Sequence, residues 1–509
     1  MSTADVVDEE YTSIEMDEIA KTIKEKFRDT APSRTSGCCF IHRVPAKLHN
    51  RTQPSAYRPE TFSFGPFHCG IQSLKVTQDL KLLYAHTLLT RKIKQNPGEE
   101  ESAATAATQT VKLASSTLVV EGRWLTLFEE CVSSIKKIET KIRHCYSEPL
   151  DLDSREFVTM MVIDGLFIIE LFLSYYLRKF FRVDEDLVDA DPLRCNNWLW
   201  IGVKRDLLLL ENQLPLFVLE HLFDILVFKE KFEGVPLMKI ILYFFKNESG
   251  LLPAKLPLDA NLEHCIEEAK HLLDLLAMLL KPSPKTTSHS PSSPWNIKNI
   301  MMKCTSRVDD STGENKRAQK RTLWMPPDFI PSAAELSRAG VKFKKGSDEL
   351  TFMDIKFVDG TFEMPQIVIH NETALMLRNL IALEQSHDKS IDMICYATLM
   401  DSLINSAEDV EVLRNQGIIV NYFGCHEDVS NIFNNLCFEE TSNNHDYYHN
   451  LSEEVGVYYK KSWHTWKATL KREYFNSPWT IISVFAATLL ILLTITSTVF
   501  TILSVMIKS

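Results

Sequence analysis

Residues 479–507 read WTIISVFAATLLILLTITSTVFTILSVMI, an apolar stretch from Trp479 to Ile507 without a charged side chain. At about 1.5 Å per residue, a helix of this length exceeds the ~30 Å hydrocarbon core of a bilayer. Such a helix crosses the membrane with tilt, or leaves its ends among the lipid headgroups. The stretch therefore predicts a single C-terminal transmembrane helix that anchors a large polar body to a lipid bilayer.

Basic residues beside this helix predict its orientation. One basic residue, Lys508, follows the stretch, whereas five basic residues lie just before it. These five are Lys460, Lys461, Lys467, Lys471 and Arg472. The positive-inside rule then places the body of a single-pass protein in the cytosol, at the plasma membrane or an endomembrane. The opening MSTADVVDEEY has neither the basic nor the apolar region of a signal peptide, so we expect insertion after synthesis.

Composition and motifs argue against several classes of protein. A net charge of −11 disfavours a nucleic-acid binder that relies on phosphate contacts, so no nucleic-acid partner is expected. The 11 cysteines are scattered, form no CxxC motif and match no zinc-ligand spacing, which is typical of reduced thiols. No dinucleotide-binding, P-loop, HExxH or GxSxG motif occurs. The sequence thus predicts no metal, no cofactor and no enzymatic activity.

Periodicity and low-complexity stretches divide the chain into five parts. The parts are an acidic mobile arm (1–36), a helical first part (37–280), a disordered Pro/Ser/Thr-rich and basic insertion (281–322), a second part (323–472) and the anchor with its two-residue tail (473–509). Helical spacing of apolar residues dominates both parts of the body. Helices are expected over 74–94, 124–145, 157–181, 206–228 with a break at Pro215, 237–246, 262–280, 371–387, 396–404, 406–415 and 427–436.

One stretch carries a β pattern. Ile355 and Phe357 alternate with polar residues, and so do Phe362 and Met364 after the Asp359-Gly360 pair. An Asp-Gly pair between alternating runs is typical of a type I′ hairpin turn, and Pro365 limits the second strand. The fold class is therefore mainly α, a helical body with one small antiparallel β element.

Several carboxylates lie within apolar runs, where a buried charge needs a partner. We expect an internal polar brace of acids, arginines and amides, with Asn212 free to cap the helix that starts near Pro215. The alternative is that two of these acids form the acid–base pair of a glycosidase. The candidate residues are Asp164, Glu170, Arg205, Asp206, Glu211, Arg378 and Glu384.

Small polar residues recur at spacings of three and four within the anchor. They are Thr494, Ser497, Thr498, Thr501 and Ser504. Such a stripe can pack one membrane helix against another, which leaves lateral self-association open. The favoured interpretation is that these hydroxyls bond the carbonyls four residues earlier in their own helix.

An ordered set of motifs covers nearly all of the chain from residue 40 to the anchor. The set comprises IHRVP (41–45), AYRP (56–59), SFGPFHCG (63–70), DGLFIIE (164–170), DLLLLENQLP (206–215), AGV (339–341), RNLIALEQ (378–385), MDSLIN (400–405), GII (417–419) and YFNSPW (474–479). In this set the chain resembles the plant-specific domain-of-unknown-function family number two hundred and forty-seven. The resemblance implies a plant membrane-associated protein without established enzymatic activity, in a family whose grass members include self-incompatibility determinants at the pollen–stigma interface.

The function expected from sequence is a plant membrane-bound recognition or signalling protein that acts through protein–protein contacts. Self-incompatibility is the process that the resemblance suggests, and the protein partner is left open. The alternatives are a carboxylate-dependent hydrolase such as a glycosidase, and an endomembrane scaffold. Carboxylates that converge in an open pocket would favour the hydrolase, whereas carboxylates sealed against cations would favour the recognition protein.

Overall fold

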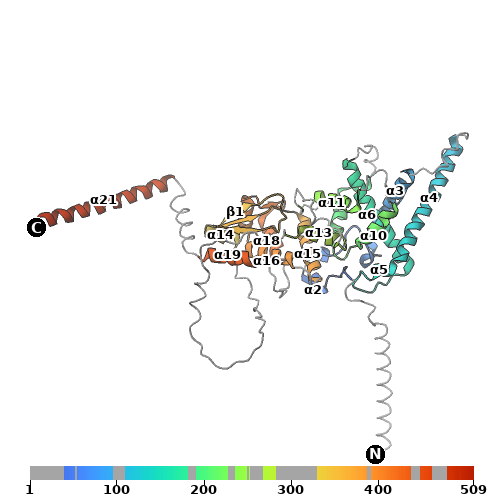
Figure 1. Cartoon of the computed structure of the whole chain (residues 1–509), viewed down its shortest axis with the longest axis horizontal. Helices are drawn as coiled ribbons and strands as arrows, with labels where there is room; N and C mark the ends of the chain where they lie inside the picture. Colours follow the sequence, from blue (N-terminus) through green and yellow to red (C-terminus); the bar gives the residue numbers. More distant parts are fainter. Residues whose placement is uncertain are drawn as a thin grey trace, which may run out of the picture. The chain divides into compact units, whose positions relative to one another are not determined.

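The computed structural model shows a mainly helical protein with small sheets (Figure 1). The described residues are 39–51, 54–95, 109–180, 191–226, 235–248, 252, 268–282, 330–386, 391–436, 448–460 and 478–508. The predicted acidic arm at 1–36, nearly all of the 281–322 insertion and the basic residues from Lys461 to Arg472 lie outside these ranges. The chain divides into two compact units.

The first unit comprises Met1–Val44, Phe62–Leu171 and Leu210–Glu233. Helix α4 lies beside α3 and α10, and α5 follows it directly (Figure 1). A short backbone bridge joins Ile41 to Tyr146. The elements of this unit are η2 (Pro66–His68), η3 (Gln72–Thr77), α3 (Gln78–Gln95), α4 (Gln109–Lys137), α5 (Glu139–Arg143), most of α6 (Ser154–Phe180) and α10 (Leu216–Leu226).

Helix α6 forms the core of the first unit. The Oδ1 atom of Asp153 accepts a hydrogen bond from the Glu156 N–H at 2.8 Å and so caps the start of the helix. Gly165 lets Leu222 of α10 approach closely, because a Cβ atom there would lie 2.4 Å from the Leu222 Cδ1 atom. By length and composition α6 could cross a membrane, but 78% of its apolar window is buried in the protein. The prediction of a core helix over this segment is confirmed.

The second unit comprises Pro45–Thr61, Phe172–Leu209 and Gly234–Ser509. Its helices before the insertion are α2 (Ala46–Arg51), η1 (Pro54–Ala56), the end of α6, α8 (Pro192–Cys195), α9 (Asn197–Asp206), α11 (Leu237–Glu248) and α13 (Leu272–Leu280). Those after it are α14 (Ala333–Arg338), α15 (Asn371–Ser386), α16 (Asp392–Leu403), α17 (Ala407–Asn415), α18 (His426–Asn434), α19 (His449–Tyr459) and α21 (Pro478–Lys508). Helix α17 begins with a capping box made by Ser406 and Asp409.

The predicted hairpin forms, but the β structure is larger than expected. Strands β2 (Lys356–Val358) and β3 (Thr361–Met364) pair antiparallel across a turn in which Asp359 and Gly360 have φ values of 48° and 75°, as a type I′ turn requires. Strand β1 (Lys342–Lys345) adds to β3 in parallel, which gives the order β1-β3-β2.

A second sheet corrects the prediction of one antiparallel element. Strand β4 (Ile367–Ile369) pairs in parallel with β5 (Ile419–Asn421). A loop and strand β2 separate β1 from β3 in the sequence, and helices α15, α16 and α17 separate β4 from β5. A local pattern of alternation cannot indicate such a partner, because each strand is only three or four residues long.

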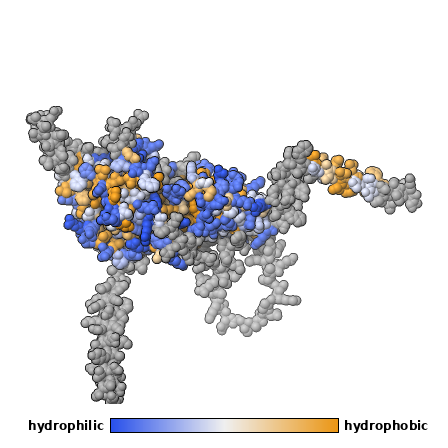
Figure 2. All heavy atoms as spheres, turned by 180° about the vertical axis from the view of Figure 1, so that it is seen from behind, coloured by the Kyte–Doolittle hydropathy of each residue, from blue (hydrophilic) through white to orange (hydrophobic). Residues whose placement is uncertain are grey.

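Helix α21 contains the apolar stretch that opened the sequence analysis. Pro478 is its first residue, a position where the missing N–H group costs no hydrogen bond. The described side chains from Phe485 to Phe500 are exposed and mostly apolar, and they form the orange rod of Figure 2. Thr494 and Thr498 donate to the carbonyl oxygens of Leu490 and Thr494, so at these two positions the hydroxyls bond within the helix.

Candidate functional site

An extended segment of the first unit, Phe62–Gly65, is held by buried side chains from distant parts of the sequence. The Oδ2 atom of Asp164 on α6 accepts a hydrogen bond from the Gly65 N–H at 3.0 Å. Its Oδ1 atom lies 2.6 Å from the Nζ atom of Lys81 on α3, and Lys81 also donates to the Ser63 carbonyl. Lys81 and Asp164 are 1% and 2% exposed. Burial raises the pKa of the Asp164 carboxyl, and the Lys81 ammonium opposes that shift.

Asn212 holds the same segment from the other side. Its Oδ1 atom accepts a hydrogen bond from the Phe64 N–H at 2.7 Å, and its Nδ2 atom donates to the Phe62 carbonyl at 2.9 Å. Four backbone polar groups of the segment, the Phe62 and Ser63 carbonyls and the Phe64 and Gly65 N–H groups, are thus satisfied by interior side chains, as buried backbone groups require. The prediction that Asn212 caps the helix near Pro215 is wrong, because α10 begins only at Leu216, four residues after Asn212. The Asn212 amide holds this distant segment.

Glu211 holds the residues that precede α2. Its Oε1 atom accepts a hydrogen bond from the Val44 N–H at 2.8 Å, and its Oε2 atom lies 3.5 Å from the Arg43 Nη1 atom. The His68 Nε2 atom is 3.2 Å from the same Oε2 atom, without the angles of a hydrogen bond. Glu211 is 3% exposed, so its charge is compensated in the interior.

Two further acids have cationic partners. Glu170 on α6 pairs with Arg91 of α3, which reasoning from sequence did not name. In the second unit Asp206 pairs with its neighbour Arg205 at 2.8 Å, the one acid–arginine pair in which both partners were among the candidates. Asp206 also accepts hydrogen bonds from the backbone N–H groups of Glu60 and Thr61 at 3.2 and 2.7 Å.

Glu384 and Arg378, both on α15, have separate surroundings. The two oxygens of Glu384 accept hydrogen bonds from the Met393 and Ile394 N–H groups at 2.9 and 3.0 Å, which caps the start of α16. The Nε atom of Arg378 is buried and has no hydrogen-bond partner among the residues that the structure describes. Its neighbour Asn379 instead donates to the Ala56 carbonyl at 2.8 Å. Sequence reasoning missed this amide.

The Glu384 cap predicts a pH dependence of stability. Burial raises the pKa of Glu384 from 4.5 to about 7, although its two backbone hydrogen bonds oppose the shift. A carboxyl that binds its proton more tightly when folded stabilises the fold fully below pH 4.5, and this contribution is lost as pH rises through 7. It amounts to roughly 3 kcal/mol.

Urea unfolding of the wild type and of Glu384→Gln at pH 5 and pH 8 measures this contribution. We expect the wild type to lose roughly 3 kcal/mol relative to the variant between the two pH values. Glu411→Gln, an exposed change on the neighbouring helix α17, is the matched control and should follow the wild type. Equal pH slopes for the wild type and Glu384→Gln would show that this carboxyl does not titrate in the range.

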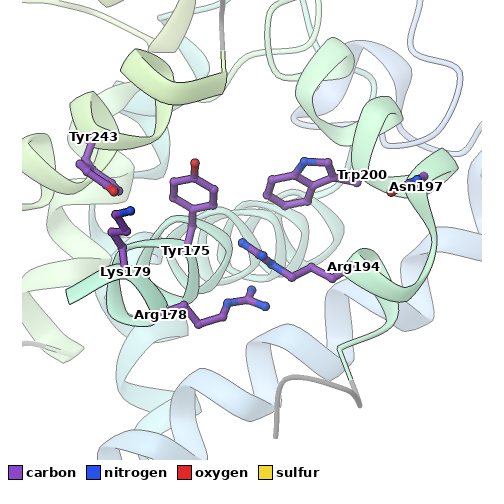
Figure 3. Close-up of a pocket in the computed structure, with 7 residues that line it drawn as sticks. All are labelled: Tyr175, Arg178, Lys179, Arg194, Asn197, Trp200 and Tyr243. Atoms are coloured by element: carbon purple, nitrogen blue, oxygen red, sulfur yellow. The ribbon is translucent and has the colours of Figure 1, made fainter. Parts of the chain in front are cut away.

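A pocket of about 510 Å³ lies in the second unit, where the end of α6 meets α8, α9 and α11. Figure 3 shows Tyr175 standing between Tyr243 and Trp200, with Arg178 and Arg194 pointing towards each other beneath it. We call it the basic aromatic pocket. Its lining residues are Tyr175, Arg178, Lys179, Arg194, Asn197, Trp200 and Tyr243. Within the described ranges, no group of three or more His, Cys, Asp and Glu side chains could hold a metal ion.

The fold defines a mainly helical protein whose buried acids are held by partners within the chain. The chain belongs to domain-of-unknown-function family 247, described as plant protein of unknown function, whose profile matches residues 41–493. The predicted family is therefore confirmed. The family description assigns no activity.

Two curated relatives from Arabidopsis thaliana are similar along most of their length. The UPF0481 protein At3g47200 is 28% identical over 477 residues, which cover 92% of this chain and 87% of the relative. The putative UPF0481 protein At3g02645 is 23% identical over 513 residues, which cover 89% and 88%. No solved structure matches the chain.

Proposed function

We propose that this protein is a membrane-bound recognition protein that acts through contacts with other proteins. The supporting observation is that each of the five candidate carboxylates is paired with a cation or accepts hydrogen bonds from backbone N–H groups within the fold. Asp164, Glu170 and Glu211 are 2%, 2% and 3% exposed and face Lys81, Arg91 and Arg43. A glycosidase needs two carboxyl groups that flank a substrate in an accessible cleft. Acids that are occupied by backbone N–H groups and cations favour a structural role.

Helix α21 supports attachment to a membrane. Its described side chains between Phe485 and Phe500 are exposed, and an exposed apolar surface of this kind is stable in lipid rather than in water. The stretch Trp479–Ile507 is long enough to span the hydrocarbon core. The basic residues before it favour a cytosolic body.

A surface for a protein partner is available in the first unit. Four apolar side chains of η3, its N-cap and the first turns of α3 are exposed and lie close together in the sequence, and interaction surfaces are built from exposed apolar groups that adjoin one another. We call them the η3–α3 surface. They are Ile71 (37% exposed), Val76 (83%), Leu82 (50%) and Leu83 (47%). Recognition in self-incompatibility, the process that the family resemblance implies, would require such a surface.

The test is capture of a specific partner by the intact, detergent-solubilised chain from its native tissue, followed by direct binding of the two purified proteins. We expect Val76→Asp combined with Leu83→Asp to weaken binding at least about tenfold, because each buried charge removes apolar contact and must be desolvated. Val358→Asp, a change at a 64% exposed apolar residue on β2, is the matched control.

Two outcomes would contradict the proposal. One is that no purified protein binds the chain saturably. The other is turnover of a glycoside or ester that is lost when Asp164, Glu211 or Glu384 is replaced by its amide, which would favour the hydrolase.

A further inference from the structure

We propose that the basic aromatic pocket binds a small planar anion, an aromatic ring that carries a carboxylate or phosphate group. The inference does not depend on the proposed contact with a protein partner. It rests on three properties of the described lining residues: their excess of positive charge, the aromatic wall beside it, and the size of the cavity.

The charge of the pocket is positive. Three cationic side chains, Arg178, Lys179 and Arg194, line it, and no acidic side chain is among the described lining residues. One nearby acid, Asp191, holds Arg178 at 2.9 Å, and among the described lining residues the cationic side chains still outnumber the acidic ones. Figure 3 shows the side chains of Arg178 and Arg194 on the same side of the pocket, beneath Tyr175, and positive charges that share a site favour an anionic ligand.

Two of these cations, Arg178 and Arg194, are held in place before a ligand arrives. Arg178 donates to the Ser174 carbonyl at 3.2 Å as well as to Asp191. The Cζ atom of Arg194 lies 5.2 Å from the ring centroid of Trp200 and 5.6 Å from that of Tyr175, within the range of cation–π contacts. A guanidinium group held in this way presents a fork of N–H donors that matches a carboxylate or a phosphate.

The aromatic residues form a wall for the ring of the ligand. Tyr175 and Trp200 are nearly parallel, with an interplanar angle of 12° and ring centroids 6.0 Å apart. The ring centroid of Tyr243 lies 5.9 Å from that of Tyr175 on its other side. Burial raises the pKa of the Tyr243 phenol further above neutral pH, where a phenol is protonated in any case and can donate a hydrogen bond. Stacked and edge-to-face contacts on such a wall favour a planar ligand over an aliphatic one.

The cavity has the size of a small-molecule site. A volume of about 510 Å³ lies within the range of about 300–1,000 Å³ that is usual for ligand pockets. Lys179, Arg194 and Asn197 are exposed, so the pocket is open to solvent on the side of its charges. An incoming anion therefore meets the cations first, and its ring then packs against the wall.

The experiment is calorimetric titration of the full chain in neutral detergent with phenyl phosphate, benzoate, inorganic phosphate and benzyl alcohol. We expect phenyl phosphate and benzoate to bind, each at least about tenfold more tightly than inorganic phosphate or benzyl alcohol. Arg194→Gln and Lys179→Gln should each weaken phenyl phosphate about tenfold. Trp200→Ala should weaken phenyl phosphate but leave inorganic phosphate unchanged.

Matched variants control for general effects. Arg155→Gln removes an exposed cation near the other end of α6, and Trp198→Ala removes an 81% exposed indole from α9 that does not line the pocket. Both should bind phenyl phosphate as the wild type does. Because Lys179 and Arg194 are exposed, their variants should keep the wild-type melting temperature.

Failure to bind any of the four probes would overturn the proposal. Equal affinities for inorganic phosphate and phenyl phosphate would also overturn it, since the site would then select a bare phosphate such as a lipid headgroup carries. Wild-type affinity in both Arg194→Gln and Lys179→Gln would place the binding elsewhere.

Discussion

Deletion of residues 479–507 is expected to move the protein from the membrane fraction to the soluble fraction almost completely. The deleted stretch carries no charge, and each apolar residue near the centre of a membrane helix contributes roughly −0.3 to −0.6 kcal/mol to insertion. Summed over the stretch, this free energy is far larger than that of any exposed contact elsewhere in the protein. Fractionation after an alkaline carbonate wash, which strips peripheral proteins from membranes, measures the effect.

Paired substitutions within α21 provide a milder version of the same test. Leu490→Arg with Leu493→Arg places two charges near the middle of the helix, each of which costs about 2.5–3.5 kcal/mol on insertion, whereas Leu490→Ala with Leu493→Ala should stay in the membrane. A deletion variant that still resisted carbonate would point to another segment such as α6. In sealed vesicles, an N-terminal tag should be digested by protease added from outside. A protected tag would reverse the proposed topology.

Lys81→Met is expected to destabilise the first unit by about 3–5 kcal/mol. The change leaves Asp164, which is 2% exposed, in the interior without its cation. The Gly65 N–H group still donates a hydrogen bond to its carboxylate. It also removes the donor to the Ser63 carbonyl. Breaking one side of a buried ion pair costs more than the pair itself contributes, because the remaining charge cannot be solvated. Urea unfolding followed by tryptophan fluorescence measures the loss.

A second substitution separates the charge from the packing. Asp164→Asn added to Lys81→Met removes the uncompensated charge but keeps an acceptor for Gly65, so the double variant should be about 1–2 kcal/mol more stable than Lys81→Met alone. Lys75→Met, at an exposed lysine of η3, should stay within about 0.5 kcal/mol of the wild type. A loss below about 1 kcal/mol for Lys81→Met would show that this pair is not important for stability.

The helices could be predicted from sequence because their signals are local. A few neighbouring residues are enough to indicate the apolar run of α6, the Asp359-Gly360 turn and the cap at Ser406. The parallel pairing of β1 with β3 and of β4 with β5 could not be predicted, because it depends on which distant segments meet. Most helix boundaries differ from the prediction by a few residues, because helix ends are weakly specified. Two predictions are wrong by more: α4 begins at Gln109 rather than Trp124, and residues 207–215 form turns and a loop between α9 and α10 instead of the expected helix.

The buried acids were predicted better than their partners. Burial follows from an apolar run such as the one around Asp164, but the identity of the opposing cation depends on tertiary packing. Lys81 could have been noticed, since it lies seven residues from both Leu74 and Leu88 and so falls on the buried face of the helical pattern. Arg91 could have been noticed in the same way, since it lies seven residues after Tyr84 and three after Leu88. Arg43 precedes the predicted helices and carried no such signal. The basic aromatic pocket was missed entirely, because four separate helices contribute to it.

The hold on Phe62–Gly65 has a consequence for the order of folding. The Gly65 N–H group donates to the Asp164 carboxylate, 99 residues later in the sequence, and the Phe64 N–H group donates to the Asn212 amide, 148 residues later. Loops of this length close slowly, because the chain loses conformational entropy before the non-local contact contributes a favourable free energy. Because the chain is synthesised from its N-terminus, this segment also leaves the ribosome long before Asp164 and Asn212 have been made. This early-synthesised segment should be among the last parts of the core to reach its native position, and Phe62 and Phe64 should be accessible to chaperones until then.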